Sequence, residues 1–357
     1  MSQNKDMVIN RLPALTWNHL GMNQSEIRDI PLPDAGTLLA EVPDVILHST
    51  DNVKRLKDIA TGCGSAVDDL LEQTDIPSNR FKTKAGETCE KPVRLDFRYG
   101  ETPKNFNYVE LTARENSAMT VVMDYRSAPG SAGFAGVQTK IRAEKNSLVR
   151  LVQVHRLGEN MTFINDIGTE IGDGARFELI QLILGCGRTY EGMRTDLNGT
   201  GACLAMDTAY IVGGTQRLDM NYAVNHIGRR TLSEINASGV LRDRAFKLFR
   251  GTIDLRKGAS GAKGNEKEDV LLLDDTVINQ TIPLILCDEE DVEGNHGATI
   301  GKLDDELLFY MQSRGIPQDA IYEMLATAHV EALLEKVTDE KTKCRVRDFL
   351  KGESCHD

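Results

Sequence analysis

The sequence predicts a mainly β protein whose core is a β-helix, with helical regions before and after it. Three observations support this fold class. A turn followed by a strand-like run recurs in the middle of the 357-residue chain, no long helical stripe interrupts that part, and helical patterns lie near both ends. These patterns divide the chain into residues 1–85, 86–295 and 296–357. A chain of this length can bury a large core.

The repeat in the middle region carries the fold prediction. Its copies NSAMTVVMDY, NSLVRLVQVH, DGARFELIQL and TGACLAMDTA begin at Asn116, Asn146, Asp173 and Thr200. The second residues of their turn pairs are Ser117, Ser147, Gly174 and Gly201, spaced by 30, 27 and 27 residues. A unit of one turn and one strand cannot bury its own apolar face, so each copy must stack on the next, as in a solenoid.

A β-sandwich is the alternative fold. A sandwich would favour hairpins with strands about 8–12 residues apart. Asn198-Gly199 is the only Asn-Gly pair in the chain, so a series of such hairpins is missing. The β-helix is therefore the favoured interpretation.

The N-terminal region is mixed and prone to form helices. DNVKRLKDIATG (51–62) begins with an Asp suited to an N-cap and ends at Gly, which predicts a helix. SAVDDLLEQTD (65–75) has the pattern of a second, short amphipathic helix. LPALTWNHLGMN (12–23) contains the only tryptophan, Trp17.

The C-terminal region, which begins near His296, predicts three helices. Acidic residues open the first, Asp304–Arg314, where they suit the helix dipole. Pro317 precedes the second, and the third covers about 339–351. The first helix carries more apolar surface than one buried face needs, so part of it should contact a partner. Its candidate partner-binding residues are Leu307, Leu308, Phe309, Tyr310, Met311 and Arg314.

Charge and composition exclude several functions. The net charge is −12, and no basic stripe of the kind that binds nucleic acid stands out. MSQNKDMVIN at the N-terminus has no apolar segment, and no run approaches the about 18 apolar residues of a membrane span. We therefore expect a cytoplasmic protein that binds neither nucleic acid nor membrane. Its seven scattered cysteines predict free thiols, and Cys344 with Cys355-His356 lacks a fourth metal ligand.

Motifs of the common enzyme classes are missing. GASGAKG (258–264) lacks the Lys-Ser/Thr ending of a phosphate-binding loop, so this chain is expected to bind no nucleotide. A β-helix enzyme that processes polysaccharides is the alternative function. It would use carboxylates such as Asp166, Asp173, Glu178 and Asp207, but the chain has few aromatic residues to stack on sugars. A purely structural solenoid is a third, weaker alternative.

His296 is the histidine with the most suggestive setting. It lies between Asn295 and Gly297, so small side chains leave its imidazole unshielded, directly before the first C-terminal helix. His155 and His226 in the repeat region are more simply satisfied polar residues of the fold.

The segment around His296 resembles a known signature. NHGATIGKLDDELLFYMQSRGI (295–316) is similar to the His-Gly-Ala-Thr or His-Glu-Ala-Thr element and the following helix of the SufB/SufD family, scaffold proteins of the SUF iron–sulfur cluster assembly system. Residues 171–214 and 237–264 resemble the repeat region of that family. Gly297, where SufB has Glu, places the chain nearer SufD. Many SufD sequences have Cys two positions before the histidine, whereas this chain has Gly294.

The resemblance implies a right-handed parallel β-helix and a non-catalytic scaffold. It implies pairing with a SufB-like paralogue, or with a second copy when alone, and binding of a SufC-like ATPase to the C-terminal helical domain. It also implies a transient iron–sulfur cluster or iron shared with the partner, with His296 as the candidate ligand. Cluster type, the participation of a flavin and the effect of Gly294 stay open.

Overall fold

Residues with positive φ form the corners of the solenoid. In the computed structural model, which describes residues 4–16 and 18–352, Asn116, Asn146, Gly174 and Gly201 have φ between 54° and 69°. Asn and Gly adopt this left-handed conformation most readily. The corners stack, and Asn146 Nδ2 donates to Asn116 Oδ1 at 3.0 Å. The predicted repeat is confirmed. The corner residues are spaced by 30, 28 and 27 residues, whereas the sequence predicted 30, 27 and 27. The difference arises because the sequence comparison counted Ser117 and Ser147, which follow the corner residue, together with Gly174 and Gly201, which occupy the corner.

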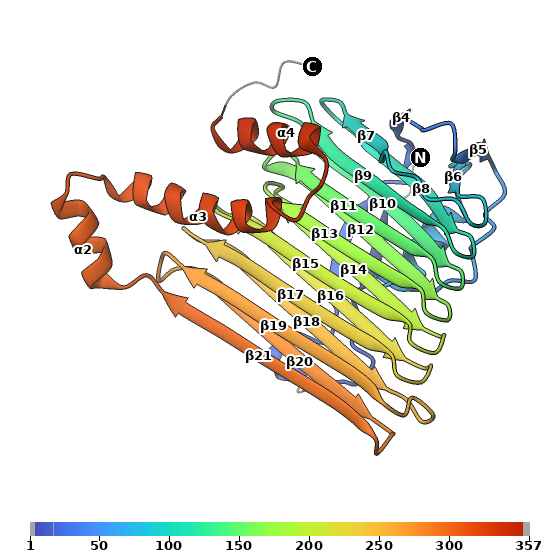
Figure 1. The fold of residues 1–357 in the computed structure, drawn as a ribbon. Helices are drawn as coiled ribbons and strands as arrows, with labels where there is room; N and C mark the ends of the chain where they lie inside the picture. Colours follow the sequence, from blue (N-terminus) through green and yellow to red (C-terminus); the bar gives the residue numbers. More distant parts are fainter. Residues whose placement is uncertain (1–3, 17, 353–357) are drawn as a thin grey trace.

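The strands between the corners form two sheets that face each other (Figure 1). In spatial order the first sheet contains β20 (Ile278–Cys287), β18 (Phe246–Leu255), β16 (Arg217–His226), β14 (Arg188–Leu197), β12 (Asn160–Ile171), β10 (Ala132–Ala143), β8 (Lys104–Ala113), β6 (Ser78–Lys82) and β5 (Leu47–Asp51), with β3 (Asp34–Ala35) beside β8. The second contains β21 (Val292–Lys302), β19 (Ala262–Leu272), β17 (Leu232–Leu241), β15 (Cys203–Val212), β13 (Arg176–Ile183), β11 (Leu148–Arg156), β9 (Ala118–Ser127), β7 (Val93–Tyr99) and β4 (Thr37–Glu41). Neighbours from β6 to β20 and from β7 to β21 run parallel, which confirms the β-solenoid.

Apolar side chains of successive turns stack between the two sheets. The register places Val121 beside Leu151, Leu151 beside Leu179, and Leu179 beside Met206. All four side chains are at most 1% exposed and belong to one continuous core cluster. Burial against the neighbouring turn is therefore what makes each repeat stable, since one turn alone has no interior.

The N-terminal region contains more strand than predicted. α1 (Ser65–Leu71) confirms the second predicted helix, and β1 (Lys5–Ile9) pairs antiparallel with β2 (Ser25–Ile30). The helix predicted over 51–62 is wrong. Asp51 ends β5, and Leu56 N donates to Glu110 Oε1 at 2.8 Å, so contacts with the sheet replace helical hydrogen bonds. A short 3₁₀ turn, Asn18–Leu20, completes this region. Trp17, Cys355 and His356 lie outside the described residues.

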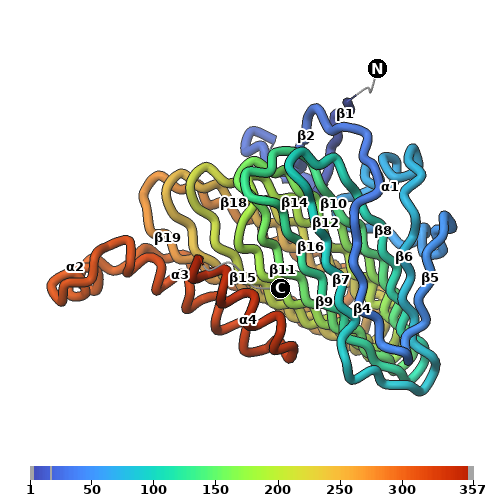
Figure 2. Tube along the Cα trace, turned by 90° about the horizontal axis from the view of Figure 1, so that it is seen from above, coloured from blue at the N-terminus to red at the C-terminus, as the bar shows by residue number. Residues whose placement is uncertain are grey.

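The three predicted C-terminal helices are present. They are α2 (Asp305–Ser313), α3 (Gln318–Leu334) and α4 (Glu340–Leu350). Figure 2 shows α3 and α4 along the outer side of the second sheet, where Val330 and Val346 pack into one cluster with Val152. β1, β2 and α1 cover the outer side of the first sheet (Figure 2). None of the helices that the structure describes is long and apolar enough to cross a membrane.

Candidate functional site

The two ends of the solenoid differ in the edge strands that they present, although no described strand covers the outer edge at either end: β4 and β5 have five residues each and are antiparallel to their neighbours, whereas β20 and β21 are longer and parallel to theirs. At one end, β5 pairs antiparallel with β6, and β4 pairs antiparallel with β7, which ends the parallel stacking. At the other end, β20 pairs only with β18 and β21 only with β19, so no described strand covers their outer edges. Uncovered backbone N–H and C=O groups are a template for another strand. We call the turn formed by β20 and β21 the open end.

His296 lies in the middle of β21, at this open end. The boundary expected at residue 296 is therefore wrong, because the last strand continues to Lys302 before α2 begins. In the register with β19, His296 stands opposite Glu266. Side chains opposite each other in neighbouring strands share a face of the sheet. Glu266 is buried between exposed Asn265 and Lys267, so its face is the interior of the solenoid. His296 thus faces the mouth of that interior and, as expected, is exposed.

Buried charged residues lie just inside the open end. Glu268 and Lys247 are at most 1% exposed and form an ion pair with each other. Thr281 joins them, since its Oγ1 donates to Glu268 Oε2 at 2.7 Å and accepts from Lys247 Nζ at 3.0 Å. This pair is compensated within the fold, as buried charges must be.

Glu266 differs from Glu268 because its carboxyl has no such partner. The side chain is 6% exposed and forms no hydrogen bond or ion pair with any other residue that the structure describes. It lies against Gly251, where a Cβ atom would be 2.0 Å from Glu266 Oε2. Burial raises the pKa of Glu266 to about 7, with a smaller contribution from the nearby charge of Glu268. Within the described residues, no group of three or more His, Cys, Asp or Glu side chains is arranged to hold a metal ion.

The predicted partner-binding residues lie on α2, which projects away from the solenoid (Figure 1), except Arg314, which is the C-cap of this helix. α2 contains no buried residue; Phe309 is 72% exposed and Tyr310 is 55% exposed. The Arg314 guanidinium lies 5.2 Å from the Tyr310 ring centre. We call the surface formed by Leu307, Leu308, Phe309, Tyr310, Met311 and Arg314 the α2 surface.

The carboxylates considered for polysaccharide chemistry do not come together. Asp166 is buried and accepts from Cys63 N at 2.8 Å, and Asp173 accepts from Thr200 N at 2.7 Å. Glu178 forms ion pairs with two arginines. Each of these side chains therefore has a partner within the fold.

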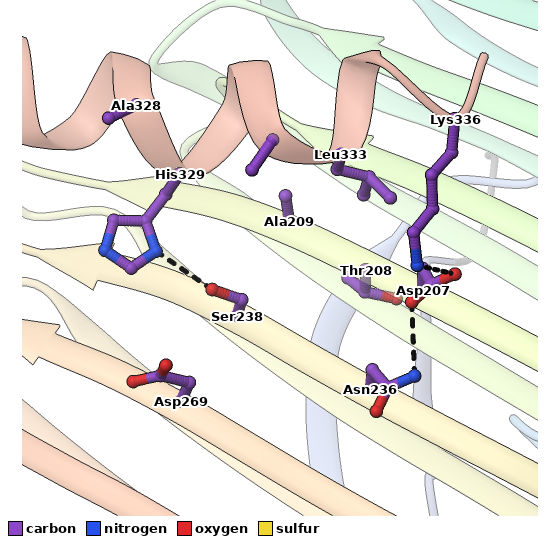
Figure 3. A pocket seen from close by; sticks show the side chains of 11 residues that line it. Asp207, Thr208, Ala209, Asn236, Ser238, Asp269, Ala328, His329, Leu333 and Lys336 are labelled. Carbon is purple, nitrogen blue, oxygen red and sulfur yellow. Dashed lines mark hydrogen bonds and ion pairs between the residues drawn. The ribbon is translucent and has the colours of Figure 1, made fainter.

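Asp207, the fourth of these carboxylates, lines a cavity of about 430 Å³ between α3 and the second sheet (Figure 3). It forms an ion pair with Lys336 at 2.8 Å and accepts from Asn236 at 3.2 Å. His329 Nδ1 lies 2.9 Å from Ser238 Oγ in the same cavity. These contacts attach α3 to the strands below it (Figure 3).

The other sequence-predicted residues have structural roles. His226 is buried between Thr231 and Ser233, with both ring nitrogens 2.8 Å from a hydroxyl, and burial lowers its pKa to about 4. The six cysteines that the structure describes are free thiols, as predicted. Gly294 faces the same side as His296, two residues earlier in β21.

Comparison with known proteins identifies the family. Residues 97–329 match the family model described as "SUF system FeS cluster assembly, SufBD core domain". The fold and this match together define the protein as a parallel β-solenoid with a SufBD core domain. Because the match covers more than half of the chain, the protein belongs to the SufB/SufD family of iron–sulfur cluster assembly proteins, and it is closest to SufD.

Two relatives named SufD and one SufBD family protein illustrate the similarity. The chain is 30% identical over 240 residues to the iron–sulfur cluster assembly protein SufD of Bacillus subtilis, which covers 65% of this chain and 55% of that protein. It is 24% identical over 289 residues to SufD of Escherichia coli, covering 78% and 67%. A SufBD family protein of Mycobacterium leprae is 26% identical over 201 residues, covering 56% and 23%. The chain thus spans less than two thirds of the first and third of these relatives.

Proposed function

We propose that this chain is a non-catalytic scaffold subunit of a SUF iron–sulfur cluster assembly complex. In this role the open end pairs with a SufB-like paralogue, or with a second copy of the chain when the paralogue is missing. The C-terminal helices bind a SufC-like ATPase, and His296 is a ligand of the iron or cluster held between the paired subunits. The single observation that carries the proposal is the uncovered last turn with His296 at its centre.

The contrast between the two ends supports pairing at the open end. At one end the edge strands β4 and β5 are antiparallel and only five residues long, whereas at the other β21 offers eleven residues of uncovered parallel strand. A solenoid of the same cross-section could continue both sheets across this edge. Ile278 and Ile300 at the open end are exposed aliphatic side chains that such a partner would cover.

The α2 surface supports the ATPase contact. Its aromatic side chains are exposed on a helix that touches the rest of the protein mainly through α3. Exposed aromatic residues beside an arginine are typical of the residues that dominate protein–protein binding. This division of labour would also explain why the chain has no phosphate-binding loop, because ATP would bind to the partner.

His296 is suited to iron by its chemistry and its position. A neutral imidazole nitrogen is a good ligand for iron. The ring is exposed at the mouth of the solenoid, where a paired subunit could supply further ligands. The polysaccharide-processing alternative receives less support, since its candidate carboxylates are engaged within the fold.

Affinity purification of the tagged chain from its native host tests this proposal. We expect to recover both an ATPase and a second solenoid subunit in stable complex with it. Recovery of the chain without either protein, under conditions that preserve weak complexes, would contradict the scaffold function.

A further inference from the structure

Glu266 is the buried titratable residue at the open end that the fold does not use. Glu268 has Lys247 and Thr281 as partners, whereas Glu266, which is only 6% exposed as a residue, forms no hydrogen bond or ion pair among the described residues. Its carboxyl oxygens keep some contact with solvent, so an incoming ion can reach them. Gly251 leaves room for the Glu266 carboxyl, and any other residue at that position would place a Cβ atom at its oxygens. The fold therefore holds a carboxyl at the open end that no described side chain engages.

The position of Glu266 relative to His296 suggests what the Glu266 carboxyl could bind. The two residues are register partners in neighbouring parallel strands, and they share the interior face. Such strands lie about 4.8 Å apart, so a carboxylate oxygen and an imidazole nitrogen on them can approach one ion from two sides. Protein oxygen and nitrogen ligands bind divalent metals at about 2.0–2.2 Å, which this spacing allows.

We infer that Glu266 and His296 together form a two-ligand site for a divalent iron ion at the open end. The remaining coordination positions stay open to water, sulfide or ligands of a paired subunit, because no third His, Cys, Asp or Glu of the described residues joins the group. Carboxylate and imidazole together are a donor set that ferrous iron accepts. Lys247 does not oppose the ion, since its charge is matched by Glu268. The inference rests on the proposed role of His296 and adds a ligand of a different chemical type.

Titration of the full-length chain with Co(II) under anaerobic conditions tests the site. Co(II) is a spectroscopic probe for ferrous iron in nitrogen and oxygen sites, and its visible absorption reports coordination by protein. We expect one Co(II) per chain, competed by Fe(II). Glu266→Gln and His296→Ala should each weaken binding by at least the about 10–100-fold that loss of even an outer partner of a metal ligand typically costs.

Two further variants make the result specific. Glu293→Gln removes an exposed carboxylate of the same strand, which is paired with Lys263 at 2.7 Å, and should leave Co(II) binding unchanged. Glu266→Asp keeps the charge but withdraws the oxygens by one methylene. It should also weaken binding, and it replaces Glu266→Gln if that variant does not melt cooperatively.

The outcomes separate this inference from the proposed function. Co(II) binding that is unchanged in Glu266→Gln or Glu266→Asp, or that survives in His296→Ala, would overturn the site, as would a wild-type chain that binds no Co(II). The scaffold function is tested by co-purification of protein partners, which requires no metal. Partners recovered with a chain that binds no Co(II) would therefore contradict the metal site alone.

Discussion

The carboxyl of Glu191 lies 3.3 Å from Nδ1 of His155 in the interior of the solenoid, and neither side chain is exposed. Glu191 Oε2 accepts from Asn165 at 2.6 Å and from Gln181 at 3.1 Å. Burial raises the pKa of Glu191 to about 8 and lowers that of His155 to about 3, so both are mainly neutral at pH 7. The contact is therefore one between two neutral groups and not an ion pair.

This pair predicts a pH-dependent stability. The folded chain holds the Glu191 proton up to about pH 8, whereas the unfolded chain loses it near the ordinary pKa of 4.5. The stabilising contribution is thus complete below about pH 4.5 and is lost as the pH rises to about 8. Glu191→Gln cannot ionise and keeps the hydrogen bonds. Relative to this variant, the wild type should lose unfolding free energy between pH 5 and 8.5 in urea titrations. Parallel curves for the two proteins would contradict this, and Glu234→Gln at an exposed position is the control.

The stacked interior predicts a large effect of a single truncation. Leu179→Ala removes a side chain that contacts the turns before and after it, and the cavity left behind cannot close easily. We expect a loss of about 2–5 kcal/mol in unfolding free energy. Chemical unfolding of this variant should be compared with that of Leu232→Ala, whose side chain is 46% exposed. Equal losses in the two variants would mean that the interior does not carry the stability.

The α2 surface predicts separate effects on binding and folding. Tyr310→Asp or Met311→Asp should weaken binding of the SufC-like ATPase in a pull-down and leave the melting temperature within about 2 °C, because α2 contains no buried residue. Leu47→Asp, an exposed strand position at the opposite end, is the matched control for ATPase binding. If both α2 variants retain the ATPase like the wild type, the α2 surface is not the contact.

The open end predicts where the paralogue pairs. Ile300 is 47% exposed in β21, and Ile300→Asp places a charge where the partner sheet would continue. Co-purification of the SufB-like subunit should fall at least tenfold, since an unpaired charge is costly in an interface. Leu232→Asp, at a strand position of similar exposure away from the open end, should leave pairing intact. Loss of pairing in Leu232→Asp and not in Ile300→Asp would move the interface away from the open end.

The fold could be predicted because it is repeated. Asn116 and Asn146 mark corners that need a left-handed residue, and each copy has the same need, so four imperfect copies add up to one signal. The structure of segment 51–62 could not be predicted because its backbone forms hydrogen bonds with residues far along the chain, such as Glu110, instead of the helical hydrogen bonds that its pattern favours. Local propensity yields to such tertiary contacts.

The candidate site was only partly visible in the sequence. His296 stands out through its small neighbours. The strand that contains it could not be predicted, because β21 is an uncovered edge strand whose residues are nearly all exposed and show no alternation of buried and exposed positions. Glu266 could not be found. The stretch KGNEKE (263–268) places polar residues on both faces of β19, so periodicity does not separate the buried glutamates from the exposed lysines.

The iron and sulfide content of the reconstituted complex tests the central claim most directly. Wild type and His296→Ala are each assembled with the paralogue and the ATPase, and their thermal melts are recorded alongside. His48→Ala, at an exposed position in β5 at the opposite end, is the control. The account predicts that the His296→Ala complex assembles and melts like the wild type but holds little iron and sulfide. Normal iron and sulfide content in that variant, with or without a lower melting temperature, would contradict the account.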